Sequence, residues 1–303
     1  MKIQPVDVER VLGKLSSTIK QEIIDANLKY KPLNGLERDN YILSVVNYLT
    51  GNDEVRAGAE RLVSWESGWS ENLIQFRETG DILDLVPKYH GKYNIVHWNG
   101  DVVKALTPMY DYTIHCILVD WLVEKYLSNV DHIFDFGCGP CDNLIRMRNF
   151  NKKAKLTGLD WTTTSQEIIS EIRSKNVDRN IFGRNFDYYN PNYNIVVPKN
   201  SGFITIASLE QVGTNFNPFL DFVMKKRPEV CVHIEPIGEL LDGTSLIDQL
   251  SILYFKKRNY LDGFLTKLCG LRDQGKVDII DARRSYTGSY YIEGHSVVVW
   301  KPI

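Results

Sequence analysis

The chain has 303 residues, of which 43% are hydrophobic and 24% are charged, and its formal net charge at pH 7 is −2. This composition is that of an ordinary soluble globular protein and excludes disordered and collagen-like architectures. Because 36 basic residues nearly balance 38 acidic ones, a nucleic-acid partner has little electrostatic support.

The sequence favours a cytoplasmic protein with no membrane partner. The first residues lack the apolar segment of a secretory signal, and no run of about 18 apolar residues predicts a transmembrane helix. Five cysteines in a chain of this length indicate reduced thiols. The oligomeric state stays open, with a homodimer as one alternative.

The first part of the chain is predicted to be helical, because apolar residues recur at three- and four-residue steps. The predicted helices cover residues 8–23, 36–49, a segment from near Asp53 to 76, and 109–127. Residues 79–108 lose this periodicity, which is typical of a functional lid or of partial disorder. Trp65 and Trp69, four residues apart, are interpreted as core or interface packing. We therefore expect a helical extension and lid over residues 1–108.

From residue 132 onward, short apolar runs alternate with helical stretches. The predicted strands are residues 132–136, 155–159, 182–186, 203–209, 230–234, 277–282 and 296–300. This alternation predicts an α/β domain over residues 109–303 with a doubly wound, mostly parallel seven-stranded sheet. A helical insertion is expected over residues 237–275. The last connection is too short for a helical crossover, so the last strand is expected to be antiparallel.

A glycine-rich loop follows the first strand of this domain. Gly137 permits a tight turn, and Gly139 lets a ligand approach the backbone. Asp160, at the end of the next strand, can accept hydrogen bonds from ribose hydroxyls. A dinucleotide would need a third glycine, but Asp142 occupies that position and would repel a pyrophosphate. Together with Asp135 before the loop, this charge pattern favours the cationic S-adenosylmethionine over NAD.

The segment resembles motif I of the class I S-adenosylmethionine-dependent methyltransferases, with Asp135-x-Gly137-x-Gly139 in the acidic-x-Gly-x-Gly position. The resemblance implies a Rossmann-like methyltransferase fold with S-adenosyl-L-methionine as cofactor. In that reading Trp161 packs against adenine and Asp187 binds its amino group. The cofactor-binding residues that the resemblance implies are Asp135, Phe136, Gly137, Cys138, Gly139, Asp160, Trp161, Phe186, Asp187, Leu209 and Glu210.

Cys138 and Cys141 have the spacing of zinc and redox motifs. Zinc needs four ligands, and the sequence offers neither a second cysteine pair nor a close histidine pair at metal spacing, so no metal is expected. A thioredoxin-like motif would need its own βαβ context. We interpret the pair as a coincidence inside the glycine loop.

Candidates for catalysis lie at the ends of the fourth and fifth strands, beside the expected cofactor crevice. A hydroxyl acceptor needs a base, and His233 is the preferred one because its unperturbed pKa is closest to neutral. Glu210 and Glu235 are the other candidates. Each has a structural alternative: Glu210 as a contact to the cofactor, His233 as a core histidine, and Glu235 as a helix cap.

Cations interleaved with aromatic residues mark a second group of candidates, in the insertion and after the sixth strand. Such residues either hold a phosphate or carboxylate of a substrate or form a solvated helix face. The candidate substrate-binding residues are Tyr254, Lys257, Arg258 and Arg284.

The resulting hypothesis is an enzyme, a methyltransferase that acts on a small-molecule acceptor. O-methylation of a hydroxyl, for instance on a sugar or sugar nucleotide, is preferred. One alternative is N-methylation of a small amine or a protein side chain. Another is a catalytically silent, cofactor-binding interaction module. The chain lacks the Asp/Asn-Pro-Pro-Tyr sequence after the fourth strand that amino-methylating DNA enzymes carry.

Overall fold

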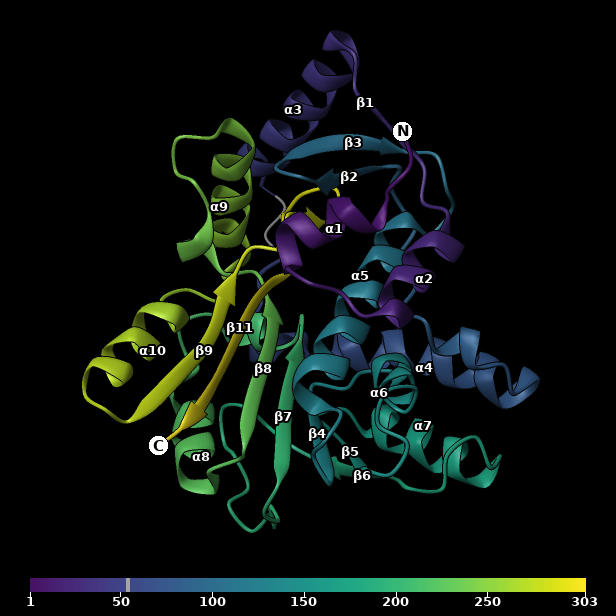
Figure 1. Cartoon of the computed structure of the whole chain (residues 1–303), viewed down its shortest axis with the longest axis vertical. Helices are drawn as coiled ribbons and strands as arrows, with labels where there is room; N and C mark the ends of the chain where they lie inside the picture. The colour runs from purple at the N-terminus through teal and green to yellow at the C-terminus, as the bar shows by residue number, and fades with distance from the viewer. Residues whose placement is uncertain (53–54) are drawn as a thin grey trace.

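The computed structural model describes residues 1–52 and 55–303. Within these residues the strands form a larger sheet of order β6-β5-β4-β7-β8-β11-β9 and a smaller one of order β1-β3-β2-β10. Figure 1 shows the smaller sheet and the N-terminal helices above one end of the larger sheet. The predicted helix start at Asp53 lies outside the described residues.

The larger sheet confirms the predicted fold class. Its strands are β4 His132–Phe136, β5 Lys155–Asp160, β6 Ile181–Asn185, β7 Ser201–Ile206, β8 Val230–Glu235, β9 Val277–Arg283 and β11 Ser296–Pro302. Strands β6, β5, β4, β7 and β8 pair in parallel. The last strand, β11, lies antiparallel between β8 and β9. The predicted antiparallel last strand is thus confirmed.

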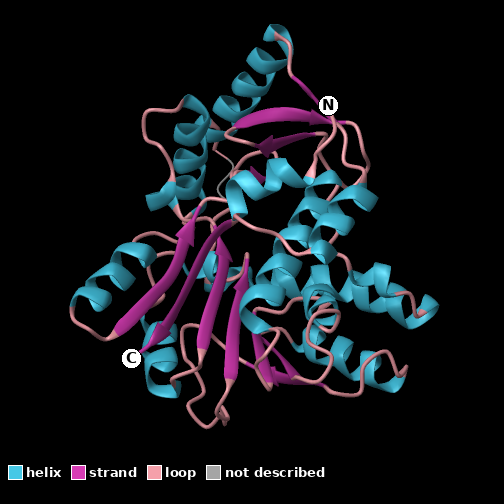
Figure 2. Ribbon diagram, viewed as in Figure 1, coloured by secondary structure: helices cyan, strands magenta, loops and turns pink. Residues whose placement is uncertain are grey.

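Helices cover both faces of this sheet (Figure 2). They are α5 Tyr110–Leu122, α6 Asp142–Met147, α7 Thr163–Ser174, α8 Asn217–Lys226 and α10 Phe264–Asp273, whereas α9 Leu246–Arg258 packs against a helix of the N-terminal part. Side chains alternate between faces along each strand. In β4, Ile133 therefore joins one hydrophobic cluster and Phe134 the other. Because both faces of the sheet are covered, side chains that point to either face are apolar, and the sequences of these strands are continuous apolar runs.

The N-terminal helices are α1 Pro5–Leu12, α2 Ser17–Ala26, α3 Gly35–Thr50 and α4 Leu62–Thr79. The prediction of a single helix over residues 8–23 is thus wrong, since the helix is interrupted between Leu12 and Ser17. Gly13 has φ of 82°, which ends α1, and the Ser16 hydroxyl accepts a hydrogen bond from the Ile19 amide at 3.2 Å, which begins α2.

The central hairpin of the smaller sheet, β2 and β3, lies in the segment 79–108 that lacked periodicity. The sheet contains β1 Tyr30–Pro32, β2 Ile95–Trp98, β3 Asp101–Ala105 and β10 Thr287–Gly288. The turn between β2 and β3 is Asn99-Gly100, both with positive φ, which is a strong short-range hairpin signal. Because β10 comes from the segment between β9 and β11, this sheet joins both ends of the chain. The domain boundary at residue 108 stays a prediction.

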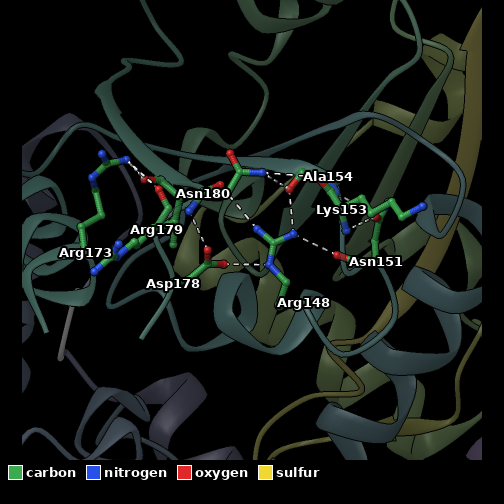
Figure 3. A network of polar contacts seen from close by, with 9 residues as sticks. Arg148, Asn151, Lys153, Ala154, Arg173, Asp178, Arg179 and Asn180 are labelled. Carbon is green, nitrogen blue, oxygen red and sulfur yellow. Dashed lines mark hydrogen bonds and ion pairs between the residues drawn. The ribbon is translucent and has the colours of Figure 1, made fainter. Parts of the chain in front are cut away.

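A polar network ties together the loops at the amino ends of β5 and β6 (Figure 3). The guanidinium of Arg148 donates to the carboxylate of Asp178 at 2.8 Å and to the carbonyls of Asn151 and Ala154 at 3.0 and 2.7 Å. These contacts fix the rim of the sheet opposite to the strands' carboxyl ends.

Among the described helices, none combines the length and apolar character needed to span a membrane.

Candidate active site

A cleft opens at the carboxyl ends of β4, β5, β6 and β7, and encloses about 750 Å³ of empty space, including the part open to solvent. Parallel sheets of this kind bind ligands at this edge, where the strand order reverses. One wall comes from the loops of the sheet, and the other from α4 and the segment after it.

The glycine loop forms the floor of the cleft and requires its two glycines. Gly137 and Gly139 have φ of 71° and 50°. A Cβ on Gly137 would lie 2.4 Å from the Cβ of Ser208, and one on Gly139 would lie 3.0 Å from the Trp69 ring. Both backbone conformation and space therefore exclude larger residues here.

Asp160 connects this loop to the second strand of the domain. One oxygen of its carboxylate accepts a hydrogen bond from the Gly139 amide at 2.9 Å. The other accepts from the Thr162 amide at 2.8 Å and from its hydroxyl at 2.7 Å. Burial raises the pKa of Asp160, while these hydrogen bonds act in the opposite direction. Asp160 lines the cleft and keeps acceptor capacity for a ligand.

The structure brings part of the predicted cofactor set together. The predicted residues that line the cleft are Gly137, Cys138, Gly139, Asp160, Trp161 and Phe186. Phe136, Leu209 and Glu210 are buried beside it without lining it. Asp187 also lies outside the lining, and its carboxylate accepts from the Tyr189 amide at 2.8 Å. Asp135 is buried within β4, and burial raises its pKa well above the ordinary value, so it is not an anionic wall of the cleft.

His233 lies in the core. Its Nδ1 is 2.9 Å from the Thr205 hydroxyl, and its Nε2 accepts a hydrogen bond from the Trp300 indole at 2.9 Å. Burial lowers the pKa of His233 to about 3. It does not line the cleft. The predicted base role is therefore withdrawn, because both ring nitrogens are occupied within the protein and the imidazole is a weak base.

Glu235 holds the turn after β7, and both oxygens of its carboxylate accept hydrogen bonds from that turn. Its carboxylate accepts hydrogen bonds from three successive amides, those of Ser208, Leu209 and Glu210, at 3.0 to 3.1 Å. Glu235 is therefore a cap, as the sequence left open. It caps the turn at residues 208–210 and not the helix that follows it in the chain. The side chain of Glu210 is buried next to that of Glu235, and burial raises the pKa of Glu210 to about 8.

The cationic residues Arg284 and Lys257, predicted to bind substrate, make their polar contacts within the protein. Arg284 makes hydrogen-bonded ion pairs with Glu293 and Asp248 at 2.7 to 2.8 Å. Lys257 donates to the Leu49 and Gly51 carbonyls at 3.3 and 2.6 Å, where α3 ends. None of these residues lines the cleft, so the predicted role in holding an anionic substrate is corrected to a structural one.

The remaining two candidates, Tyr254 and Arg258, belong to an aromatic cluster and do not line the cleft. The ring of Tyr254 lies between Tyr48 and Tyr291, with centroids at 5.2 and 5.1 Å. The Arg258 guanidinium lies 5.7 Å from the Tyr254 ring and 5.4 Å from the Tyr260 ring. Such stacking uses the faces that a substrate would need.

Sequence reasoning missed the opposite wall of the cleft. Trp65 and Trp69 stack with ring centroids 5.3 Å apart and line the cleft, as does Tyr89 from the following segment. Their spacing on one helix face was the available signal, but it equally suits a core contact. On the sheet side, the Tyr188 and Ser208 hydroxyls both donate to the Phe136 carbonyl, at 2.8 and 2.7 Å, which links β4 to the neighbouring loops.

The charge of the cleft is acidic. Asp142 and Asp160 are the charged residues among the described ones that line it, and no Lys, Arg or His is found there. Burial raises the pKa of Asp142 to about 6, while His90 nearby lowers it. A wall of this character suits a neutral or cationic ligand better than a phosphate.

The comparison with family models and the search of curated proteins give no match. In structure, the chain is similar to the O-methyltransferase NcsB1 of neocarzinostatin biosynthesis, with 13% identity, TM-score 0.45, and coverage of 79% of this chain and 70% of that one. It is similar to the N-methyltransferase NodS from Bradyrhizobium japonicum WM9, with 10% identity, TM-score 0.44, and coverage of 63% and 86%. It is also similar to the [4+2]-cyclase SpnF, with 13% identity, TM-score 0.49, and coverage of 78% and 95%.

Proposed function

We propose that the protein is a methyltransferase that uses S-adenosylmethionine to methylate a hydroxyl of a small, uncharged acceptor. The observation that carries this proposal is the composition of the cleft. It combines the glycine loop and Asp160 with aromatic side chains and has no cationic side chain among its described lining residues.

The lining residues fit this cofactor. Asp160 stands where a carboxylate can accept from ribose hydroxyls, and Trp161 and Phe186 offer apolar surface for adenine. Asp142 opens α6, so that a dinucleotide's pyrophosphate would meet a carboxylate at this helix end. A ligand with a sulfonium and an ammonium group meets no such repulsion. When bound, it supplies an activated methyl group.

We assign the acceptor to the part of the cleft lined by Trp65, Tyr89, Asn143 and Gln211. Aromatic faces and amide groups bind neutral polar molecules, such as sugars and phenols, by stacking and hydrogen bonding. A sugar nucleotide is disfavoured because its phosphates would face Asp142 without a cation. Of the acceptors considered from the sequence, sugars and sugar nucleotides, we therefore retain the uncharged sugars.

N-methylation of a small amine is the second candidate, and the acidic cleft favours it. Asp142 would attract an ammonium group, although the amine must lose its proton before it can accept a methyl group. O-methylation and N-methylation can be told apart by testing which acceptor is methylated. A neutral polyol and an amine of similar size would occupy the same part of the cleft.

Calorimetric titration with S-adenosylmethionine and S-adenosylhomocysteine tests the shared premise. We expect binding in the micromolar range, and transfer of labelled methyl groups to a panel of methyl glycosides, catechol and small amines. Absence of binding at millimolar cofactor would contradict the proposal. Binding without turnover of any acceptor would favour the silent interaction module instead.

A further inference from the structure

A histidine beside the cleft is not explained by the contacts described so far. The chain has six histidines. Burial lowers the pKa of four of them, which makes these imidazoles weak bases: His97, His115, His233 and His295. His132 begins β4, at the edge of the sheet opposite to the cleft. His90 is the one that remains next to the cleft.

His90 is paired with a carboxylate. Its Nδ1 lies 3.3 Å from the carboxylate of Asp111, in the first turn of α5. The Gly91 amide donates to both oxygens of that carboxylate, at 3.1 and 3.2 Å. Burial alone would raise the pKa of Asp111, but the contacts with His90 and with backbone amides keep it below its ordinary value. The carboxylate is thus ionised and accepts a hydrogen bond from Nδ1–H.

This arrangement leaves Nε2 of His90 as the basic nitrogen. A carboxylate on one ring nitrogen fixes the tautomer, orients the ring and stabilises the imidazolium that forms when the other nitrogen takes a proton. The side chains of His90 and Asp111 keep 10% and 12% of their surface exposed. They are therefore shielded from bulk water but not sealed in the core, unlike His233.

The pair does not itself line the cleft, but His90 contacts a residue that does. The His90 ring is 4.6 Å from the ring of Tyr89, which lines the cleft, and 5.0 Å from the ring of Tyr112. The Tyr112 hydroxyl lies 3.4 Å from the carboxylate of Asp142, a second lining residue. His90 also lowers the pKa of Asp142, which burial alone would raise further.

We propose that His90 is the general base for the acceptor hydroxyl, oriented by Asp111; this rests on the proposed O-methyltransferase function. The acceptor oxygen bonds to the methyl carbon while the S–CH₃ bond breaks and its electron pair passes to sulfur. The hydroxyl proton goes to Nε2 of His90, and the imidazolium is stabilised by Asp111. Catalytic hydrogen bonds of this kind often form only once the substrate is in place.

Besides Asp111, five titratable groups lie around His90: three rings close to its own and two groups further away. Tyr89 on its own segment, Tyr112 and His115 on α5 have their rings within 5.7 Å of the His90 ring. His295, at the start of β11, follows behind His115 with ring centroids 4.9 Å apart. Asp142 on α6 adds a second carboxyl group. Asp111 is the only one of these for which a contact with an imidazole nitrogen of His90 is found among the described residues.

The test compares H90A, H90Q and D111N with H132Q, a matched histidine substitution at the far edge of the sheet. Methyl transfer to methyl α-D-glucoside and catechol is measured against pH, and S-adenosylhomocysteine affinity is measured by calorimetry. We expect H90A and H90Q to lower kcat by about 100-fold or more. Their affinity for S-adenosylhomocysteine should stay within about twofold, because neither change removes a group that lines the cleft.

Two readouts separate a base from a structural residue. Added imidazole should restore part of the rate that H90A has lost. H132Q should be as active as the wild type, and imidazole should not change its rate. D111N should lower kcat by about 10-fold, because the His90 ring loses the carboxylate that orients it and stabilises the imidazolium formed during the reaction.

Full activity of H90A and H90Q would overturn the assignment while leaving the proposed function intact. Equal loss of activity and of S-adenosylhomocysteine affinity, without rescue by imidazole, would assign His90 a structural role and overturn it as well. A wild-type protein that binds S-adenosylhomocysteine but methylates neither acceptor would contradict O-methylation itself, and the base role with it.

Discussion

The charged residues at the cleft and those around the helical insertion are used in opposite ways. At the cleft, Asp142 and Asp160 line a space that a ligand can enter. Near α9, Arg284 lies between Glu293 and Asp248 and has no room for a substrate. In the sequence both groups looked like candidates for binding. The comparison teaches that a charged motif indicates a site only when its partners lie outside the protein.

Loss of Arg284 should have the largest effect, and on stability alone. The side chains of Asp248 and Glu293 are 3% and 2% exposed. R284M would leave both carboxylates buried without their partner, which costs about 3–5 kcal/mol of the free energy of unfolding. Urea denaturation measures this loss. K257M is the control and should cost less than about 1 kcal/mol, because its ammonium group caps a helix end near the surface.

If R284M instead kept its stability and lost only methyl transfer, Arg284 would be a substrate contact after all. That result would break the comparison between the two groups of charges.

Replacement of Asp160 should affect both binding and loop order. D160A removes the acceptor for the Gly139 and Thr162 amides and for ribose hydroxyls. Loss of hydrogen bonds to a charged group costs about 1.5–3 kcal/mol, so cofactor affinity should fall by about 10- to 100-fold. Calorimetry measures it, and D178N at the opposite edge of the sheet serves as a control with unchanged affinity. Equal affinities of D160A and the wild type would contradict the assigned ribose contact.

The pH dependence of stability should reveal His233 as a core residue. Its folded pKa of about 3 lies below the ordinary value of 6.5, so the unfolded chain binds the proton more tightly. Stability is therefore fully present above pH 6.5 and falls as pH drops toward 3, by about 1.4 kcal/mol per pH unit for one histidine.

The measurement is the difference between the wild type and H233Q, because buried carboxyl groups such as Glu210 titrate in the opposite sense. Denaturation at pH 7.0, 6.0 and 5.0 should show a difference between the two proteins that shrinks as pH falls. A constant difference would mean that His233 is not buried in its neutral form.

The smallest effect is expected for Asp187, on which the resemblance and the structure differ. The family pattern gives it a contact with the adenine amino group, whereas its carboxylate here accepts from the Tyr189 amide outside the cleft lining. D187N should change cofactor affinity by less than about twofold, since an amide oxygen can still accept that hydrogen bond. A tenfold loss in calorimetry would restore the role that the sequence pattern implied.

The sheet could be predicted from the sequence because its signals are local. Apolar runs such as residues 230–234 mark buried strands wherever they occur, and the glycine loop with Asp160 depends on one strand–loop–helix unit. The small sheet was not predicted, although Asn99-Gly100 marks its hairpin. Its strands are short, and β10 joins them from a segment that follows nearly 200 residues later, with Gly288 paired to His97.

The sequence by itself determined the positions of the strands in the chain, the glycine loop and the acidic residue at the end of the next strand, since each depends on residues close together in the chain. Only the tertiary structure decided which charges are free. It buried His233 against Trp300 and paired Arg284 with buried carboxylates, and it placed His90, from the segment after α4, against Asp111 of α5. Such pairings depend on packing between distant segments, and no local pattern of residue types encodes which partner a charge will meet.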